Sequence, residues 1–372
     1  MTGWLPICVN TWTLKRYIKK SDKQIKMIQH EFRHGDDGYR YHRDIIADFS
    51  TNTWFKGPDP GLLNYLKEVI HTISHYPELQ GESLTRQLAD YHQLAPDQIA
   101  VTNGTAEAIF LIAQTFTGSS SRIIVPTFSE YEHGCQLFNH KLSFTRANTI
   151  NQLDTIPEGL LWLCNPNNPT GQLYGKDLLK KLIKNNPQTI FIIDEAYSDF
   201  TLEQTSMVPD IPLFKNLVIL KSLTKNHCLP GLRIGYLLAH QQLMTKIINF
   251  RPPWSVNTLA LKAGEYLLEH PHIEIEDLLE YHALCRELQS EIKNINGFEV
   301  LPSSTGFFLV KTPYQAPVLK DTLVNEFGLL IRDASNFKSL STNHIRIATL
   351  TKEKNILLVD ALKKVSEMIR GC

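Results

Sequence analysis

The sequence has no excess of charge of either sign, because 38 Lys and Arg side chains balance 38 Asp and Glu side chains among 372 residues. A balanced chain has no strong field to attract nucleic acid or an anionic membrane surface, so neither is expected as a partner. No apolar run approaches the ~20 residues of a membrane helix. The first residues mix Lys and Arg with Trp and Tyr and lack the apolar core of a secretory signal. These absences favour a cytoplasmic enzyme.

Cysteine is scarce and scattered. None of the six cysteines forms a Cys-x-x-Cys pair; they are Cys8, Cys135, Cys164, Cys228, Cys285 and Cys372. This spacing argues against a disulfide framework and against a zinc site, so no metal is expected. The glycine patterns of P-loop and dinucleotide-binding proteins are also missing. A phosphate-bearing ligand would therefore need another kind of site.

From about residue 48, short apolar runs alternate with helical segments. The expected strands are Ile99–Thr102, Arg122–Val125, Leu160–Cys164, Thr189–Asp194, Leu217–Lys221 and Ile234–Ala239. The expected helices are Leu62–Ser74, Ser83–Tyr91, Ala106–Phe116, Tyr131–Asn139, Lys176–Asn185 and Gln241–Asn249. Strands that are apolar throughout and separated by helices indicate an α/β fold with a mainly parallel sheet covered on both faces.

The pattern changes after Pro252 and Pro253. A helical region is expected from about 256 to 294, with a break near Pro271, and a last helix from Lys352 to Arg370. The short strands expected here are Phe298–Leu301, Phe307–Lys311, Leu329–Arg332 and His344–Ala348. We therefore expect an N-terminal arm at 1–47, with a possible helix at Leu14–Glu31, a large cofactor-binding domain at 48–250 and a smaller α+β domain at 251–372.

Polar side chains stand at the ends of successive strands, which is where ligands of such sheets bind. Lys225 follows one strand, Asp194 ends another and Tyr197 comes three residues later. Asn168 lies in the Asn-Asn-Pro-Thr-Gly turn after a third strand. Taken singly, these are a surface lysine, a helix N-cap, a core tyrosine and a turn residue. As an ordered set, they match an aldehyde, a pyridine nitrogen and a phenolic oxygen.

A phosphate group has candidate partners as well. The start of the helix near residue 106 offers backbone N–H groups and a hydroxyl. Ser222 and Arg233 add a second hydroxyl and a guanidinium group, and Phe128 is placed to stack on an aromatic ring. The residues at the helix start are Gly104, Thr105 and Ala106. A ligand with an aldehyde, a pyridine ring, a phenolic oxygen and a phosphate is pyridoxal phosphate.

Over roughly residues 34 to 365, this set resembles the fold type I, or aspartate aminotransferase-like, superfamily of pyridoxal phosphate enzymes. The resemblance implies a seven-stranded-type sheet, and it makes Lys225 the lysine that bonds the cofactor aldehyde. It also implies a homodimer in which Tyr76 reaches the cofactor phosphate of the neighbouring subunit. Arg346, within His344–Ala348, corresponds to the arginine that binds the substrate α-carboxylate.

Within this superfamily the chain is similar to the branch that contains threonine-phosphate decarboxylase and histidinol-phosphate aminotransferase. Segments at 126–131, 253–257 and 330–337 resemble the decarboxylase. That likeness implies that Arg332 and His34 bind a substrate phosphate. The stretch Asn52–Gly57 lies near the expected substrate entrance and adds Asn52 to the candidates.

The resemblance implies a lyase that decarboxylates O-phospho-L-threonine to (R)-1-aminopropan-2-yl phosphate, a step of cobalamin biosynthesis. An aminotransferase acting on histidinol phosphate or a related amino acid would use the same residues, although such enzymes more often carry Tyr where Phe128 stands. A third interpretation is a non-catalytic aminotransferase-like ligand sensor fused to a DNA-binding module. The 33 residues before His34 are too few for a winged helix, and the presence of Lys225 and Asp194 also disfavours it.

Overall fold

The computed structural model describes residues 34–153, 155–270 and 273–370, and everything from Gly35 onward belongs to one compact unit. Residues up to His34 form a separate unit. The helix expected at Leu14–Glu31 and most of the expected N-terminal arm lie outside the described residues. No helix in the described part of the chain is long and apolar enough to cross a membrane.

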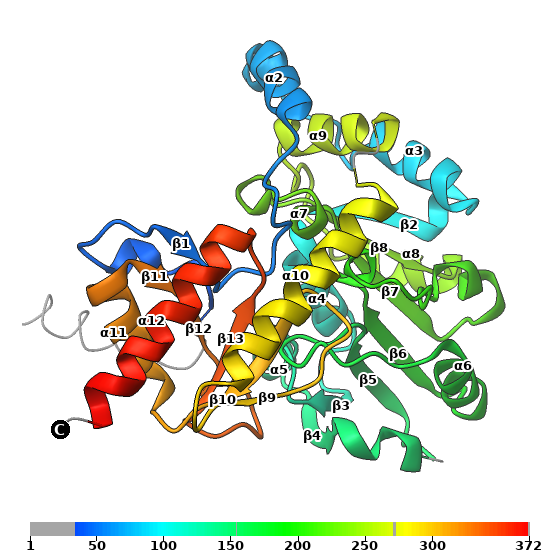
Figure 1. Cartoon of the computed structure of the whole chain (residues 1–372). Coiled ribbons are helices and arrows are strands. Elements are labelled where there is room, and N and C mark those ends of the chain that lie inside the picture. Colours follow the sequence, from blue (N-terminus) through cyan, green and yellow to red (C-terminus); the bar gives the residue numbers. More distant parts are fainter. Residues whose placement is uncertain (1–33, 154, 271–272, 371–372) are drawn as a thin grey trace, which may run out of the picture. The chain divides into compact units, whose positions relative to one another are not determined.

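A seven-stranded sheet forms the centre of the larger part of this unit (Figure 1). Its strands are β2 (Ile99–Thr102), β3 (Ser120–Val125), β4 (Lys141–Arg146), β5 (Gly159–Cys164), β6 (Thr189–Asp194), β7 (Leu217–Ser222) and β8 (Gly235–Ala239). Their spatial order is β2-β8-β7-β6-β5-β3-β4. Only β8 pairs antiparallel with its neighbours in this sheet. The expected α/β fold with a mainly parallel sheet is confirmed.

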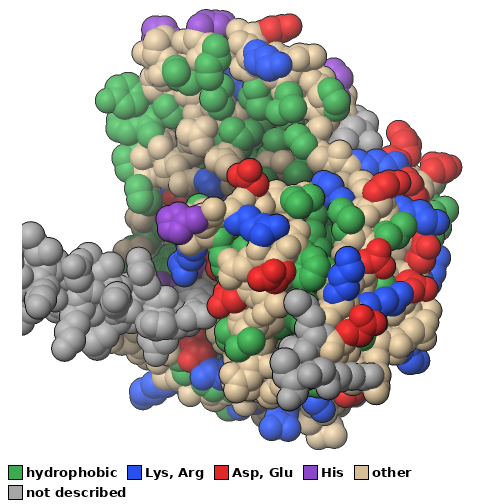
Figure 2. All heavy atoms as spheres, turned by 60° about the vertical axis from the view of Figure 1, so that its left-hand side comes forward, with side chains coloured by type: hydrophobic (Ala, Val, Ile, Leu, Met, Phe, Trp, Pro, Cys, Tyr) green, Lys and Arg blue, Asp and Glu red, His purple; other side chains and the backbone are tan. Residues whose placement is uncertain are grey.

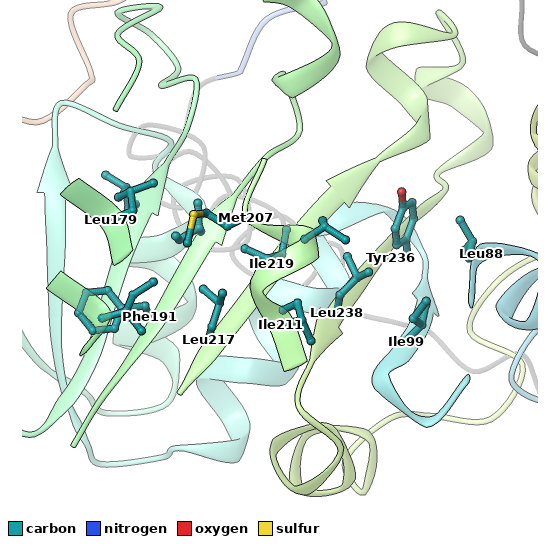
Figure 3. Close-up of a cluster of buried hydrophobic side chains, with 14 of the residues drawn as sticks. Leu88, Ile99, Leu179, Phe191, Met207, Ile211, Leu217, Ile219, Tyr236 and Leu238 are labelled. Carbon is teal, nitrogen blue, oxygen red and sulfur yellow. The ribbon is translucent and has the colours of Figure 1, made fainter. Parts of the chain in front are cut away.

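Both faces of the sheet are buried because successive side chains of each strand point to opposite sides. On one face Phe191, Leu217, Ile219 and Leu238 join a single apolar cluster (Figure 3). The other face carries their alternating neighbours, such as Ile192 and Val218. The helices of this part are α2 (Pro60–Val69), α3 (Glu82–His92), α4 (Gly104–Thr115), α5 (Glu130–Leu137), α6 (Lys176–Asn185), α7 (Leu223–Asn226), α8 (Gln241–Ile248) and α9 (Thr258–Glu269).

A smaller sheet follows, with the order β12-β13-β10-β9. Its strands are β9 (Glu299–Val300), β10 (Phe307–Lys311), β12 (Arg332–Asp333) and β13 (His344–Ala348). The helices of this region are α10 (Ile275–Lys293), α11 (Ala316–Phe327) and α12 (Lys352–Arg370). The expected smaller sheet domain is therefore present.

Helix α10 connects the two apolar cores. Leu278 and Tyr281, near its start, join the cluster of the large sheet, whereas Leu288 and Ile292 join the cluster of the small sheet. Helix α9 packs on α2, where Ala263 and other residues of α9 surround Leu62. Residues after 251 thus pack against α2, which belongs to the expected large domain at 48–250. The domain limits stay a prediction.

The structure differs from the expected elements in three places. The strand expected at Leu329–Arg332 is divided at Ile331 into β11 (Leu329–Leu330), which pairs with β1 (Ala47–Asp48), and β12, which pairs with β13. The helix expected at Leu62–Ser74 leaves the α conformation after Val69 and continues as a 3-10 turn, η2 (Ile70–Ser74). Strand β4 was not expected. It is a largely exposed edge strand with a basic residue at each end, a composition that protects sheet edges.

Candidate active site

A pocket opens where the C-terminal ends of β5, β6 and β7 meet the N-terminus of α4. It contains most of the side chains that the sequence selected for the cofactor. Its lining residues are Thr105, Ala106, Phe128, Tyr131, Cys164, Asn168, Asp194, Ala196, Tyr197, Thr224, Lys225 and Arg233. The fold therefore brings together groups from five separate stretches of the chain.

Lys225 lies in the single turn of α7, directly after β7. The turn is fixed on both sides, because the Trp54 N–H donates to the Lys225 carbonyl over 2.9 Å and Ser222 caps the helix by accepting from the Thr224 N–H. Burial, together with the positive charges of Arg346 and Arg233, lowers the pKa of the Lys225 amine to about 8. About one amine in ten is then neutral and nucleophilic at pH 7.

Asp194 is buried and receives two hydrogen bonds. The Tyr131 hydroxyl donates to its Oδ2 over 2.7 Å, and the Ala196 N–H donates to its Oδ1 over 3.0 Å. Burial raises the pKa of the Asp194 carboxyl, and these hydrogen bonds act against that rise. The carboxylate is therefore held in place, ready for a cationic N–H such as a protonated pyridine nitrogen.

Sequence reasoning missed Tyr131 as a site residue. Its ring stacks on Trp162 with centroids 5.6 Å apart and meets Phe128 edge to face at 5.8 Å. Tyr131 is the second residue of α5 and stands only three residues after Phe128, so its closeness in sequence to that candidate was the available signal.

The N-terminus of α4 and Arg233 form a cradle for an anion. Gly104 has φ +71°, and a Cβ there would lie 2.5 Å from Nη2 of Arg233, so only glycine allows this approach. The Asn103 side chain makes no capping hydrogen bond with the helix. Helix N–H groups beside a guanidinium suit a phosphate. Ser222 was expected here too, but it does not line the pocket, and its Oγ lies 2.8 Å from the Thr224 hydroxyl.

Two buried arginines stand side by side on the small sheet, because Arg332 of β12 is the direct cross-strand partner of Arg346 of β13. Arg346 donates from Nη1 to Oδ1 of Asn168 over 2.6 Å and from Nη2 to the Ser50 carbonyl. Arg332 donates from Nη2 to Oδ1 of Asn336 over 2.8 Å. Because Asn168 also lines the pocket, the arginine pair is tied to the rim of the candidate cofactor site.

This end of the site contains unsatisfied polar atoms. Within the described residues, Nε of Arg346 and both amide atoms of Asn52 are buried without a hydrogen-bond partner of normal geometry. Burial raises the pKa of the neighbouring Tyr197 phenol, and the positive charge of Arg346 and, less strongly, the Asn52 amide act against that rise. Such atoms normally find partners, so the arrangement suits a polar ligand.

One predicted residue, Tyr76, is not brought to the pocket. Tyr76 is highly exposed and packs on Trp254 with ring centroids 5.1 Å apart. His34 belongs to the separate unit that ends there. Their roles stay predictions.

The residues present fit pyridoxal phosphate. The anion cradle suits its phosphate, the buried Asp194 suits its ring nitrogen, and Lys225 supplies a partly neutral amine within the same pocket. Among the described residues, no three His, Cys, Asp or Glu side chains are grouped to hold a metal ion.

Comparison with known proteins agrees with this geometry. A curated threonine-phosphate decarboxylase of Salmonella typhimurium is 29% identical over 87% of this chain and 92% of its own length. A curated histidinol-phosphate aminotransferase of Ruminiclostridium cellulolyticum is 28% identical over 78% of this chain and 83% of its own length. The crystal structure of an L-threonine-O-3-phosphate decarboxylase from Porphyromonas gingivalis superimposes with a TM-score of 0.81 at 36% identity, covering 87% of this chain and all of the other.

The family described as aminotransferase class I and II matches residues 58–362, which is most of the chain. That range contains the lysine, the aspartate, the anion cradle and both buried arginines. The chain therefore belongs to the aminotransferase class I and II family, and its cofactor is pyridoxal phosphate.

Proposed function

We propose that this enzyme decarboxylates O-phospho-L-threonine to (R)-1-aminopropan-2-yl phosphate and so serves cobalamin biosynthesis in the cytoplasm. The observation that carries the proposal is the cross-strand pair of buried arginines, Arg332 and Arg346. A substrate with both an α-carboxylate and a phosphate has two anionic groups, and adjacent guanidinium groups can bind one each. The names of two similar proteins, one curated and one of known structure, support this substrate.

In this proposal the cofactor is held by the residues around it. Asp194 accepts from the pyridine nitrogen. Because Oδ1 of Asn168 already accepts from Arg346, its NH₂ group is left to donate, together with the Tyr197 hydroxyl, to the phenolic oxygen. Phe128 stacks on the ring. The phosphate is held by Gly104, Thr105, Ala106, Ser222 and Arg233.

When bound, pyridoxal phosphate accepts the electron pair that is released when a bond at the substrate Cα breaks. Lys225 carries the proton chemistry, because an amine with a pKa of about 8 can both accept and return a proton near neutral pH. Arg346 and Arg332 orient the substrate from its two anionic ends, with Asn52 and His34 as further contacts, and this orientation selects which bond breaks. Phe128 and Tyr131 close one wall against water.

We also propose a homodimer in which Tyr76 reaches the cofactor phosphate of the partner subunit. The support is an exposed apolar surface near α2, at the upper end of the face shown in Figure 2. Large exposed apolar side chains of α2 and of the segment that follows it are Leu63, Ile70, Ile73, Tyr76 and Leu79, and Trp254 packs on Tyr76. Surfaces of this kind commonly mark protein interfaces.

A second candidate function is transamination of histidinol phosphate. It is favoured by the similarity to the histidinol-phosphate aminotransferase of Ruminiclostridium cellulolyticum, whose identity nearly equals that of the decarboxylase. That reaction would use Lys225 to remove the Cα proton, and Arg332 would again bind a phosphate.

In the deciding experiment, the enzyme is loaded with pyridoxal phosphate and incubated with O-phospho-L-threonine. Carbon dioxide and the phosphorylated amine are then measured. Equal amounts of both products are expected. Release of neither, together with amino transfer from histidinol phosphate to 2-oxoglutarate in a parallel reaction, would replace the decarboxylase by the aminotransferase.

A further inference from the structure

A second cavity lies beside α7 and is separate from the cofactor pocket. Its volume is about 780 Å³, within the range of small-molecule sites, and none of its lining residues lines the first pocket. The division falls within one helical turn, because Lys225 lines the cofactor pocket whereas Leu223 and Asn226 line the second cavity. Nothing in the proposed reaction uses this space.

Negative charge is in excess around the cavity. The Lys221 ammonium lies 3.4 Å from Oδ1 of Asp199 and 3.8 Å from Oε2 of Glu195, so two carboxylates face one cation. Lys221 and Glu195 are almost completely buried, and Glu274 adds a third carboxylate at the exposed side of the cavity.

His92, one of the two histidines that line the cavity, does not restore the balance. His92 lies 2.9 Å from the Tyr236 hydroxyl through Nε2, and burial lowers the pKa of its ring to about 4. It is therefore neutral at physiological pH. The Lys221 ammonium also lines the cavity, but it is already paired with Asp199 and Glu195, so a cationic ligand would still meet an excess of carboxylates.

Asn226 supplies an unused acceptor. Its side chain is more than nine-tenths buried, and its Nδ2 donates to Oδ2 of Asp199 over 2.7 Å. Its Oδ1 is buried and accepts no hydrogen bond from any described residue. A buried carbonyl oxygen without a donor is costly, and a ligand N–H would satisfy it.

The remaining wall is apolar. Leu267, Leu268 and Leu278 line it, and the Tyr91 ring stands nearby in the same lining. Such a wall accepts a short hydrocarbon group, and an aromatic face favours a cation.

We propose that this cavity binds a small organic cation, an ammonium or guanidinium compound with N–H donors and a short apolar tail. One N–H donates to Oδ1 of Asn226, the charge lies near Asp199 and Glu274, and the tail packs on the leucine wall.

A ligand bound in this cavity can affect the active site through the backbone of α7. Asn226 directly follows Lys225 in the chain, and the Lys225 carbonyl accepts hydrogen bonds from the Cys228 N–H and the Trp54 N–H. A ligand that holds the Asn226 side chain therefore restrains the turn that positions the reactive amine. The cavity is in this sense a regulatory site.

The test uses n-butylguanidinium, which unlike a primary amine does not react readily with the cofactor aldehyde, and the uncharged, equally shaped n-butylurea. Binding to the enzyme loaded with pyridoxal phosphate is measured by calorimetry, and the absorption of the bound cofactor is recorded in the same samples. We expect saturable binding of the guanidinium, binding of the urea weaker by tenfold or more, and a shift in absorption at saturation.

Three variants locate the site. Asn226→Leu, which keeps the side-chain volume and removes the acceptor, should weaken guanidinium binding tenfold or more. Glu274→Gln should weaken it several-fold. Glu299→Gln removes one exposed carboxylate from the small sheet and should leave binding unchanged. Equal affinity for the urea, unchanged binding in Asn226→Leu, or no saturable binding below 10 mM (on the order of the weakest specific affinities) would each overturn the proposal. Because none of these readouts requires turnover, they are independent of which reaction the enzyme catalyses.

Discussion

The two ends of the active site differ in how completely their polar groups are satisfied. At the cofactor end, Asp194 already holds hydrogen bonds from Tyr131 and Ala196. At the substrate end, Nε of Arg346 and the amide of Asn52 have no hydrogen-bond partner of normal geometry among the described residues. The fold alone thus organises the cofactor end, whereas the substrate end keeps polar atoms that a bound ligand can satisfy.

This difference explains why the sequence identifies the cofactor more readily than the substrate. Groups that define pyridoxal phosphate chemistry stand on strand ends and first helical turns, where backbone geometry fixes them. The groups proposed to choose the substrate stand on β12 and β13 of the small sheet and on the segment near Ser50, which are separated by hundreds of residues. Mutations should therefore remove all chemistry at one end and alter selectivity at the other.

The largest effect is expected from Lys225→Ala. Loss of the amine should abolish covalent attachment of the cofactor and lower activity by at least about 10⁴-fold. The measurement is reduction with borohydride followed by mass spectrometry, which should show no added cofactor. Lys215→Ala changes an exposed lysine and serves as the control. Retained labelling or turnover in the Lys225 variant would contradict the assignment.

Asp194→Asn tests the cofactor end without removing the covalent bond. The variant should keep the cofactor but lose about 10²–10³-fold in kcat, because an amide cannot keep the ring nitrogen protonated. Absorption spectra and kcat are measured together. Asp210→Asn, another buried carboxylate, which pairs with Lys180 at 2.8 Å, is the matched control. Near-normal kcat in Asp194→Asn would show that this carboxylate has no part in the chemistry.

Arg332→Ala tests the substrate end. We expect kcat/KM for the phosphorylated substrate to fall about 100-fold, the value of one or two charge-assisted hydrogen bonds. Cofactor affinity should not change, and Arg332→Lys should restore part of the loss. An equal decline in cofactor affinity would mean that Arg332 is structural, and the proposed contrast between the two ends would fail.

The pKa of Lys225 connects the two ends, because Arg346 contributes to its value of about 8. The rate at which apoenzyme captures the cofactor should rise about tenfold per pH unit below pH 8 and level off above it. Since 8 is below the ordinary 10.5, the fold favours the neutral amine. This group therefore makes the apoenzyme more stable as the pH rises from 8 to 10.5. Stopped-flow absorption gives the midpoint, and Arg346→Met should move it upward; an unmoved midpoint would exclude that coupling.

The sequence allowed the fold class and most of the cofactor pocket to be predicted, because strand-end residues converge wherever parallel strands do. It could not show that Arg332 and Arg346 are cross-strand partners, since that register depends on the division of β11 from β12 at Ile331. It also could not show that the Ser222 hydroxyl caps its own helix, and the role of Ser222 toward the phosphate stays a prediction. A short polar side chain can either cap its own helix or contact a distant ligand, and the periodicity of the sequence does not show which of the two occurs.

Substitution of Tyr131 is expected to have the smallest effect, and it gives the most sensitive test of the difference between the two ends of the site. Tyr131→Phe removes one donor to Asp194 but keeps the ring that stacks on Trp162. The carboxyl should become easier to protonate, so kcat should fall several-fold to tenfold, about 1–1.5 kcal/mol, with a displaced pH profile. Tyr174→Phe, another buried tyrosine, whose hydroxyl lies 3.5 Å from the Ala147 carbonyl, should change neither quantity. If the Tyr131 variant lost activity without any displacement of its pH profile, packing rather than the hydrogen bond would hold Asp194, and the cofactor end would be organised by shape instead of by polar contacts.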